Sequence, residues 1–146
     1  MTHRDKTADA AGQLQLQDSG VLEVDKLTAE DIFAMQLEQH RTIVFQRQYF
    51  FAKSLRRMWR FDFAIDRYKV AVEIDGIVVR WINGQRVCMG RHASIGGIQD
   101  DNEKINTAIL LGWSVLRFTS SEVKSRNPLA MTLRVLASRG WRQYGK

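Results

Sequence analysis

The stretch that most constrains the fold of this chain is residues 59–76, WRFDFAIDRYKVAVEIDG. It predicts two consecutive strands, because apolar residues dominate on both sides of a short polar turn at Asp66 and Arg67. Three carboxylates interrupt the apolar pattern, namely Asp62, Glu73 and Asp75. An ionised carboxylate is costly to bury without a partner, so the positions of these acids limit both the fold and the function.

Strand side chains alternate between two faces, and this assigns the acids to one face of each strand. The large apolar residues of the first strand share one face, Trp59, Phe61, Phe63 and Ile65. Its other face carries Arg60, Asp62 and Ala64. In the second strand Val70, Val72 and Ile74 share one face, and the other carries Lys69, Ala71, Glu73 and Asp75. The pattern therefore predicts an apolar face toward a core and an acidic face away from it.

The length of the turn decides which residues of the hairpin face each other. If the turn spans residues 66–67 or 65–68, Asp62 faces Ala71 and Glu73 becomes its diagonal neighbour, with about 7–8 Å between Cα atoms. A cation bonded to oxygens at about 2.1 Å then fits between the two carboxylates. A three-residue turn without a bulge would put the two acids on opposite faces and exclude a shared ion.

Clustered carboxylates repel one another unless positive charge compensates them. Arg60, Lys69 or the neighbouring basic segment would do so as ordinary surface ion pairs, and a bound cation would do so as a metal site. The spacing alone leaves both interpretations open.

The remaining pattern predicts an α/β fold, a mixed sheet with helices packed on it. Helices are expected at residues 28–40, where Thr28 and Asp31 form a capping box, and at residues 98–111 and 128–139. Further strands are expected at residues 42–50, from residue 77 to an Asn-Gly turn at 83–84, and at residues 113–119. Residues 1–22 are polar and predict a flexible tail, which leaves residues 23–146 as a single domain.

A second group of candidate residues follows the hairpin. Arg91 and His92 are adjacent in a Gly-rich loop, where the pair can meet a phosphate and the imidazole can act as general acid or base. An exposed loop histidine without a role is the alternative. On the next helix Lys104 shares a face with Ala108, so its ammonium is expected to reach the strand carboxylates or to pair with Asp100.

The charge of the chain favours an acidic partner, because the formal net charge is +6 and the pI is near 9.8. Basic residues gather between positions 41 and 69, where aromatic residues interleave, and again after position 124. The candidates for contact with a DNA backbone are Arg56, Arg57, Arg60 and Arg91. A solvated basic surface over an aromatic core is the alternative.

The sequence offers no sign of a membrane partner. No apolar run approaches the roughly 20 residues that a membrane span needs. The first residues lack the apolar stretch of a secretion signal. We therefore expect a cytoplasmic location.

Five segments occur in an order that resembles a known family: RFDF, VAVEIDG, GRH, DNEKIN and GWSVLRFT. Together they resemble a branch of the PD-(D/E)XK nuclease superfamily, the compact phage and prophage endonucleases related to very-short-patch repair endonucleases. The similarity runs from about Trp59 to Thr119, less than half of the chain. It implies a restriction-endonuclease-like mixed β-sheet flanked by α-helices, in a bacterium or a phage-infected host cell.

The resemblance also implies an active site. Asp62 takes the place of the first metal ligand of the family and Glu73 that of the second. Asp75 stands where the E-x-K form has Lys, and we count it among the implied metal ligands. Related branches draw a basic residue from the following helix, which Lys104 matches, and His92 matches a residue near the active centre.

The implied chemistry is hydrolysis of phosphodiester bonds with Mg²⁺, or Mn²⁺ as the alternative ion. Lys104 and His92 would position the attacking water or stabilise charge on the phosphoryl oxygens. The expected function is thus a metal-dependent DNA endonuclease, with structure-selective and nicking enzymes among the options. A homodimer would let two sites cut two strands in concert.

Two other functions compete with this expectation. The Asp75 departure favours a non-catalytic DNA-binding module that retains the nuclease fold. A weaker alternative is a structural protein whose basic surface meets RNA.

Overall fold

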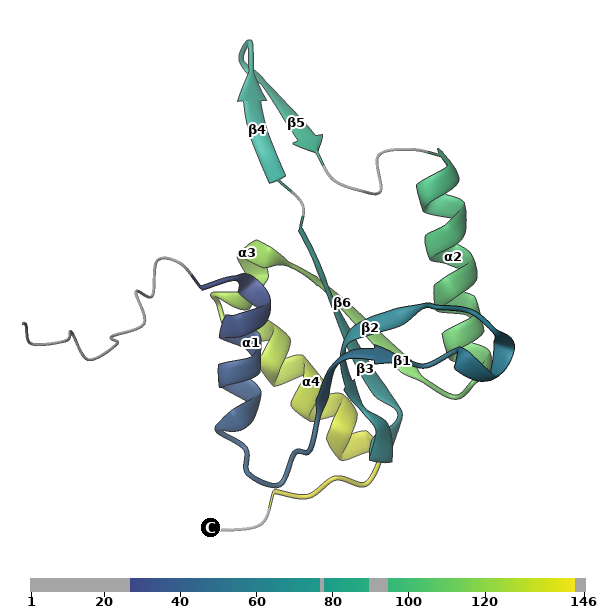
Figure 1. Ribbon diagram of the computed structural model, residues 1–146. Helices are drawn as coiled ribbons and strands as arrows, with labels where there is room; N and C mark the ends of the chain where they lie inside the picture. Colours follow the sequence, from purple (N-terminus) through teal and green to yellow (C-terminus); the bar gives the residue numbers. More distant parts are fainter. Residues whose placement is uncertain (1–26, 77, 90–94, 144–146) are drawn as a thin grey trace, which may run out of the picture.

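The computed structural model describes residues 27–76, 78–89 and 95–143 (Figure 1). Its helices are α1 (Ala29–Glu38), α2 (Ile95–Leu110), α3 (Ser120–Val123) and α4 (Asn127–Ser138). Its strands are β1 (Gln46–Phe50), β2 (Arg60–Ile65), β3 (Val70–Asp75), β4 (Val78–Ile82), β5 (Gln85–Met89) and β6 (Ser114–Thr119). The expected α/β class is confirmed at this level. The predicted tail at residues 1–22 lies outside the described residues.

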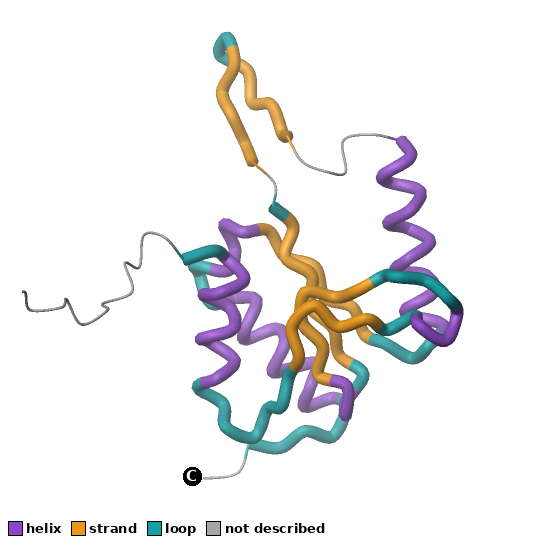
Figure 2. The backbone as a smooth tube through the Cα atoms, in the orientation of Figure 1, coloured by secondary structure: helices purple, strands orange, loops and turns teal. Residues whose placement is uncertain are grey.

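One mixed sheet organises the fold, with the strand order β1-β2-β3-β6. Strands β1, β2 and β3 pair antiparallel in sequence order, and β6 pairs parallel to β3. The connection from β3 to β6 contains the β4–β5 hairpin and then α2. The hairpin forms a separate two-stranded sheet and stands apart from the main sheet in Figure 2.

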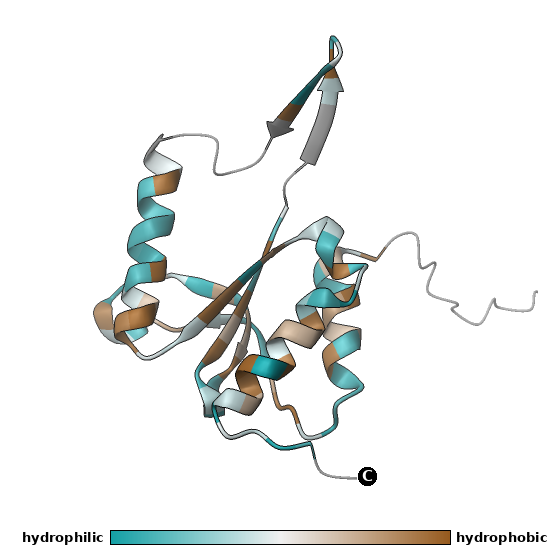
Figure 3. Cartoon of the chain, turned by 180° about the vertical axis from the view of Figure 1, so that it is seen from behind, coloured by the Kyte–Doolittle hydropathy of each residue, from teal (hydrophilic) through white to brown (hydrophobic). Residues whose placement is uncertain are grey.

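Helices cover both faces of the main sheet. On one face α1, α3 and α4 pack on an apolar cluster that includes Phe63 and Val72. A neighbouring cluster on this face joins Ile65 and Val70 to Leu136 of α4. On the other face, Ala108 of α2 packs with small and aromatic residues, among them Phe61, Ala64, Ala71 and Trp113. Figure 3 shows the apolar colouring along the central strands between these two layers.

The predicted faces are right for β3 and wrong at the start of β2, where Trp59 and Phe61 both pack on the α2 face. Phe61 packs on the α2 face, whereas Phe63 packs on the α1 face. The pairing of β2 with β3 ends at Phe63. On its other side, β2 pairs with β1 through Arg47 and Tyr49, and Gln48 between them has a left-handed backbone with φ 52°. The simple alternation fails here because this part of β2 is no longer paired with β3 on one side and pairs with a distorted part of β1 on the other.

The hairpin register differs from the expected one by two residues. Ala64 pairs with Ala71, and Ile65 pairs with Val70, which leaves a four-residue connection at residues 66–69. Residues Asp66–Tyr68 form a 3₁₀ turn, and Lys69 follows with a left-handed φ of 53°. The same register continued by one residue puts Asp62 directly opposite Glu73, so the two acids are closer neighbours than predicted.

The residues predicted to begin and end the helices and turns are mostly confirmed. Thr28 and Asp31 form the predicted capping box of α1, and Gly112 after α2 has φ 84°. The Asn83-Gly84 turn has positive φ at both residues, as a two-residue hairpin requires. However, α2 begins at Ile95 rather than residue 98, because Gly96 and Gly97 join the helix instead of a loop. The strand predicted at residues 42–50 forms only from Gln46 onward.

Within the described residues, no helix combines the length and the apolar character that crossing a membrane requires.

Phe63→Ala should destabilise the fold by about 3–5 kcal/mol, because it removes a fully buried ring that contacts Phe33 edge-on at a centroid distance of 5.1 Å. Val44→Ala is the control, since Val44 is 80% exposed and its truncation should cost less than about 0.5 kcal/mol. Urea denaturation of both variants measures the difference. Similar losses in the two variants would contradict this placement of the core.

Candidate active site

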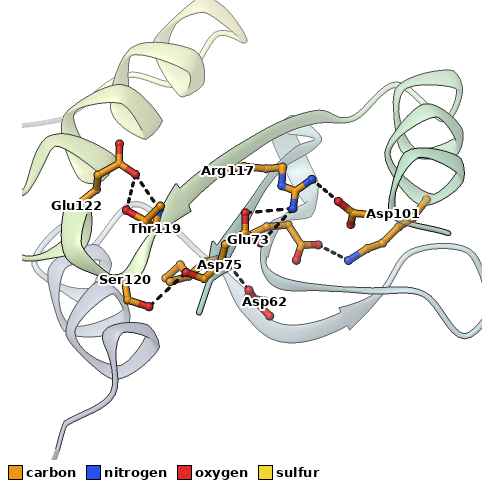
Figure 4. A network of polar contacts seen from close by, with 10 residues as sticks. Asp62, Glu73, Asp75, Asp101, Arg117, Thr119, Ser120 and Glu122 are labelled. Atoms are coloured by element: carbon orange, nitrogen blue, oxygen red, sulfur yellow. Dashed lines mark hydrogen bonds and ion pairs between the residues drawn. The ribbon is translucent and has the colours of Figure 1, made fainter. Parts of the chain in front are cut away.

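The acids singled out in the sequence lie at one end of the main sheet, where β3 and β6 finish (Figure 4). Asp62 comes from β2, and Glu73 and Asp75 come from β3. Helix α2 supplies Lys104 and Asp101 to the same group, as ion-pair partners of β3 and β6 side chains. The structure thus brings four predicted site residues together from three elements.

Glu73 and Lys104 form a largely buried ion pair. The Lys104 ammonium donates to Oε1 of Glu73, and the two side chains are only 16% and 14% exposed. The ammonium also lies over the ring of Phe61, 5.7 Å from its centroid. Of the two partners considered for Lys104, the structure therefore shows the strand carboxylate.

Burial raises the pKa of Glu73 from 4.5 to about 7. The positive charge of Lys104 opposes this rise, and the negative charge of Asp62 adds to it. Asp62 and Glu73 are therefore near enough to interact electrostatically. The Glu73 carboxyl therefore titrates near neutral pH, which suits a group that exchanges a proton or binds a cation there.

Asp62 lies where the β2–β3 ladder has ended. Its Oδ2 accepts a hydrogen bond of 2.8 Å from the backbone N–H of Ile74. Its Oδ1 accepts one of 3.4 Å from Nε2 of Gln48, which also donates to Glu30 of α1 at 3.3 Å. These bonds hold the carboxylate in place between the two strands.

Asp75 is bound by a residue that the sequence reasoning missed. Nη2 of Arg117 lies 3.0 Å from both oxygens of Asp75, and Nη1 donates to Asp101 of α2. Arg117 is on β6, in register with Glu73. The backbone carbonyl of Asp75 also accepts a 3.3 Å bond from Ser120 at the start of α3.

Of the two residues that the sequence analysis missed, Arg117 and Gln48, only Arg117 carried a signal in the sequence. Arg117 is a single charge within the apolar strand SVLRFT, as the acids are within theirs. Gln48 has no comparable signal, because its role depends on a left-handed backbone inside β1.

The described residues contain no group of three or more His, Cys, Asp or Glu side chains that are close enough to hold a metal ion. Asp62 and Glu73 remain as a pair of neighbouring carboxylates, while Asp75 faces a guanidinium. Metal binding by all three acids therefore stays a prediction. His92 and Arg91 lie outside the described residues.

The basic candidates differ in how they are placed. Arg57 forms an ion pair of 2.6 Å with Glu103 of α2 and lies over the ring of Trp59, 4.7 Å from its centroid. Arg56 has a left-handed backbone after a 3₁₀ turn, and it is exposed, as is Arg60 at the start of β2. Arg56 and Arg60 therefore present their charges to solvent close to the strand that carries Asp62.

No known protein-family profile, curated protein or solved structure matches this chain.

Glu73→Gln should remove a pH dependence of stability. The raised pKa means that the folded chain holds the Glu73 proton more tightly than the unfolded chain does. This contribution to stability is therefore present below pH 4.5, falls as the pH rises to about 7, and is then constant. The loss is on the order of 3 kcal/mol.

Denaturation at a series of pH values from 4 to 8, with a chelator present, measures this effect. Glu38→Gln is the control, because Glu38 is exposed on α1 and should keep the wild-type profile. An unchanged profile in Glu73→Gln would show that Glu73 has an ordinary pKa.

Proposed function

We propose that this chain is a metal-dependent DNA endonuclease of the PD-(D/E)XK type. The observation that carries the proposal is the buried pair of Glu73 and Lys104 beside Asp62, at the edge where β2 and β3 part. This pair joins residues that the sequence resemblance had assigned to two different motifs. An ion pair without a function is usually exposed at the surface, whereas the side chains of both partners are largely buried here.

The topology supports the same proposal. The resemblance implies acids on two consecutive strands and, in the related branches, a basic residue drawn from the helix that follows. Here β2 and β3 are these two strands, and α2 follows in the crossover to a parallel strand. Helices on both faces of the sheet complete the arrangement.

The donor set fits Mg²⁺, or Mn²⁺, with Asp62 and Glu73 as the residues that would hold the ion. Mg²⁺ in proteins is commonly bound by one or two carboxylates, with water and substrate phosphate as its other ligands. The negative charge of Asp62 contributes to the raised pKa of Glu73, and a cation bound between the two carboxylates would relieve this repulsion. When bound, the ion supplies a Lewis acid that polarises the phosphodiester and makes water a better nucleophile.

The residues of the chain then have distinct roles. Glu73 fixes the Lys104 ammonium within the site. A fixed ammonium can donate to the attacking water or to a phosphoryl oxygen as negative charge develops there. Asp62 is held by Ile74 and Gln48, so it needs little reorganisation to act. Arg117 pairs with Asp75 and Asp101 and offsets part of their negative charge, which lowers the repulsion near an incoming phosphate.

The exposed arginines Arg56 and Arg60 would contact the DNA backbone beside the scissile bond. Arg57 would contribute less, because Glu103 already compensates its charge. Arg91 and His92 remain candidates from the sequence resemblance.

A non-catalytic DNA-binding module is the second candidate. The observation that favours it is the bidentate contact of Arg117 with Asp75, which ties up the third acid of the predicted metal set. Such a module would bind DNA through the same arginines and leave it intact.

Incubation with supercoiled plasmid and Mg²⁺ should convert the plasmid to nicked or linear forms. Glu73→Ala and Lys104→Met should each lower the rate by on the order of 100-fold or more, because each removes one side of the catalytic pair. Arg134→Gln is the control, since Arg134 is exposed on α4, on the far face of the sheet from α2. Cutting that persists in Glu73→Ala would sink the assignment, and binding without cutting by the wild type would support the module.

DNA binding without metal should depend on salt through Arg56 and Arg60. The double variant Arg56→Gln and Arg60→Gln should reduce the slope of log affinity against log salt by about 2, because two phosphate contacts are lost. Fluorescence anisotropy with a labelled duplex gives the slope. An unchanged slope would place the DNA-binding surface elsewhere.

A further inference from the structure

The β4–β5 hairpin stands outside the packed layers of the fold. Among the described strands it pairs only with itself, and it projects beyond the end of β3, away from the main sheet (Figure 1). Its side chains from Trp81 to Arg86 are all exposed, and none of them belongs to the apolar clusters on the main sheet. An isolated two-stranded hairpin is at best marginally stable in water, so contact with a partner would stabilise it.

One face of the hairpin carries an aromatic ring beside a guanidinium. Trp81 and Arg86 are cross-strand partners, so their side chains project from the same face. Trp81 is 70% exposed, whereas the other three tryptophans of the chain are half-buried or buried. Trp and Arg are among the residues that most often carry the binding energy of an interface. This face therefore has the character of a binding surface.

The charge of the hairpin selects an acidic partner. Residues 78–89 contain Arg80 and Arg86 and no acid, and the sequence has no acid between Asp75 and Asp100. The whole chain has a formal net charge of +6, so a second copy of it would be repelled. A nucleic acid is attracted instead, because each of its phosphates carries a negative charge.

The dimensions of the hairpin fit the major groove of B-form DNA. That groove is about 12 Å wide and about 8.5 Å deep, and it admits a two-stranded β-ribbon. Each strand of the hairpin has five residues. At about 3.4 Å per residue the ribbon is about 17 Å long, so it reaches the floor of the groove while its base stays joined to β3. The two-residue turn at Asn83 and Gly84 keeps the tip narrow.

The hairpin also begins close to the candidate active site. Strand β3 ends at Asp75 and β4 begins at Val78, so residues 76 and 77 alone separate the ribbon from the strand that carries Glu73 and Asp75. A duplex with the ribbon in its groove would therefore present its backbone near these acids.

We propose that the β4–β5 hairpin enters the major groove of double-stranded DNA and positions the duplex for the candidate active site. The face with Trp81 and Arg86 lies toward the base edges, where Arg86 donates to acceptors and Trp81 makes apolar contact with thymine methyl groups. The inference rests on the proposed function, because it names the element that holds the same DNA substrate. It goes beyond hydrolysis, since neither residue belongs to the pair of Glu73 and Lys104.

The test uses the full chain with a chelator and without metal, so that no DNA is cut. Fluorescence anisotropy with a labelled DNA duplex gives the affinity. Trp81→Ala and Arg86→Gln should each weaken binding by about tenfold, because each removes one groove contact. Both side chains are exposed, so the substitutions leave the main sheet intact. Val44→Ala and Arg134→Gln are the matched controls, an exposed apolar and an exposed basic residue outside the hairpin, and should bind as the wild type does.

Tryptophan fluorescence reports the contact itself. Acrylamide quenches exposed tryptophan, and the difference between the wild type and Trp81→Phe isolates the signal of Trp81. The DNA duplex should protect this signal. Methyl green, which occupies the major groove, should remove the protection, whereas netropsin, which occupies the minor groove, should leave it. A duplex RNA of the same sequence should protect little, because the major groove of A-form RNA is too deep and narrow for side chains to read.

The outcomes separate the groove, the partner and the two proposals. The inference is overturned if both hairpin variants bind DNA as the wild type does, if netropsin rather than methyl green removes the protection, or if duplex RNA protects as well as DNA. Protection that rises with protein concentration in the absence of DNA identifies a second copy of this chain and also overturns it.

The hairpin proposal and the endonuclease proposal fail separately. Hairpin variants of wild-type affinity leave plasmid cutting, and its loss in Glu73→Ala, unaffected. A chain that binds through the hairpin and cuts nothing supports the DNA-binding module and retains the groove contact. A wild type that neither binds the duplex nor cuts the plasmid overturns both proposals.

Discussion

The paired part of the β2–β3 hairpin stops at Phe63 and Val72, and the structure beyond this point depends on how the freed groups are satisfied. The N–H of Ile74, which has no ladder partner there, donates instead to the carboxylate of Asp62. The strands therefore part without leaving a buried donor unbonded. Beside this point Glu73 meets Lys104, on the face of the sheet that α2 covers.

Acids are tolerated on these apolar strands because positive charges compensate them. Of the nearby bases considered from the sequence, Lys69 pairs with Asp66 at 2.7 Å. The compensating cations come from elements distant in sequence, Lys104 of α2 and Arg117 of β6. Buried ion pairs are poor stabilisers because desolvation offsets much of their attraction. Keeping such a pair at a sheet end is therefore more easily understood as a requirement of function than of stability.

Much of this arrangement follows from local pattern, and the remainder does not. Alternation placed Glu73 and Asp75 together on the face that α2 covers, and helix periodicity turned Lys104 toward them. The pattern could not show that Phe61 packs on the opposite face from Phe63. Nor could it show that a 3₁₀ turn with a left-handed Lys69 shifts the hairpin connection to residues 66–69. These depend on single backbone dihedrals. The role of Arg117 depends on β6 being the parallel neighbour of β3, which is a property of topology rather than of any one segment.

The β4–β5 hairpin pairs only with itself among the described strands, within the crossover that joins β3 to α2. Its hydrogen bonds are thus independent of the main sheet, and the entropy of closing a longer loop there grows only slowly with length. Lengthening or replacing this hairpin alters no strand pairing in the main sheet, which carries the candidate active site. The crossover is therefore the natural place for homologous chains to differ in length, and for an inserted reporter or affinity sequence to be tolerated.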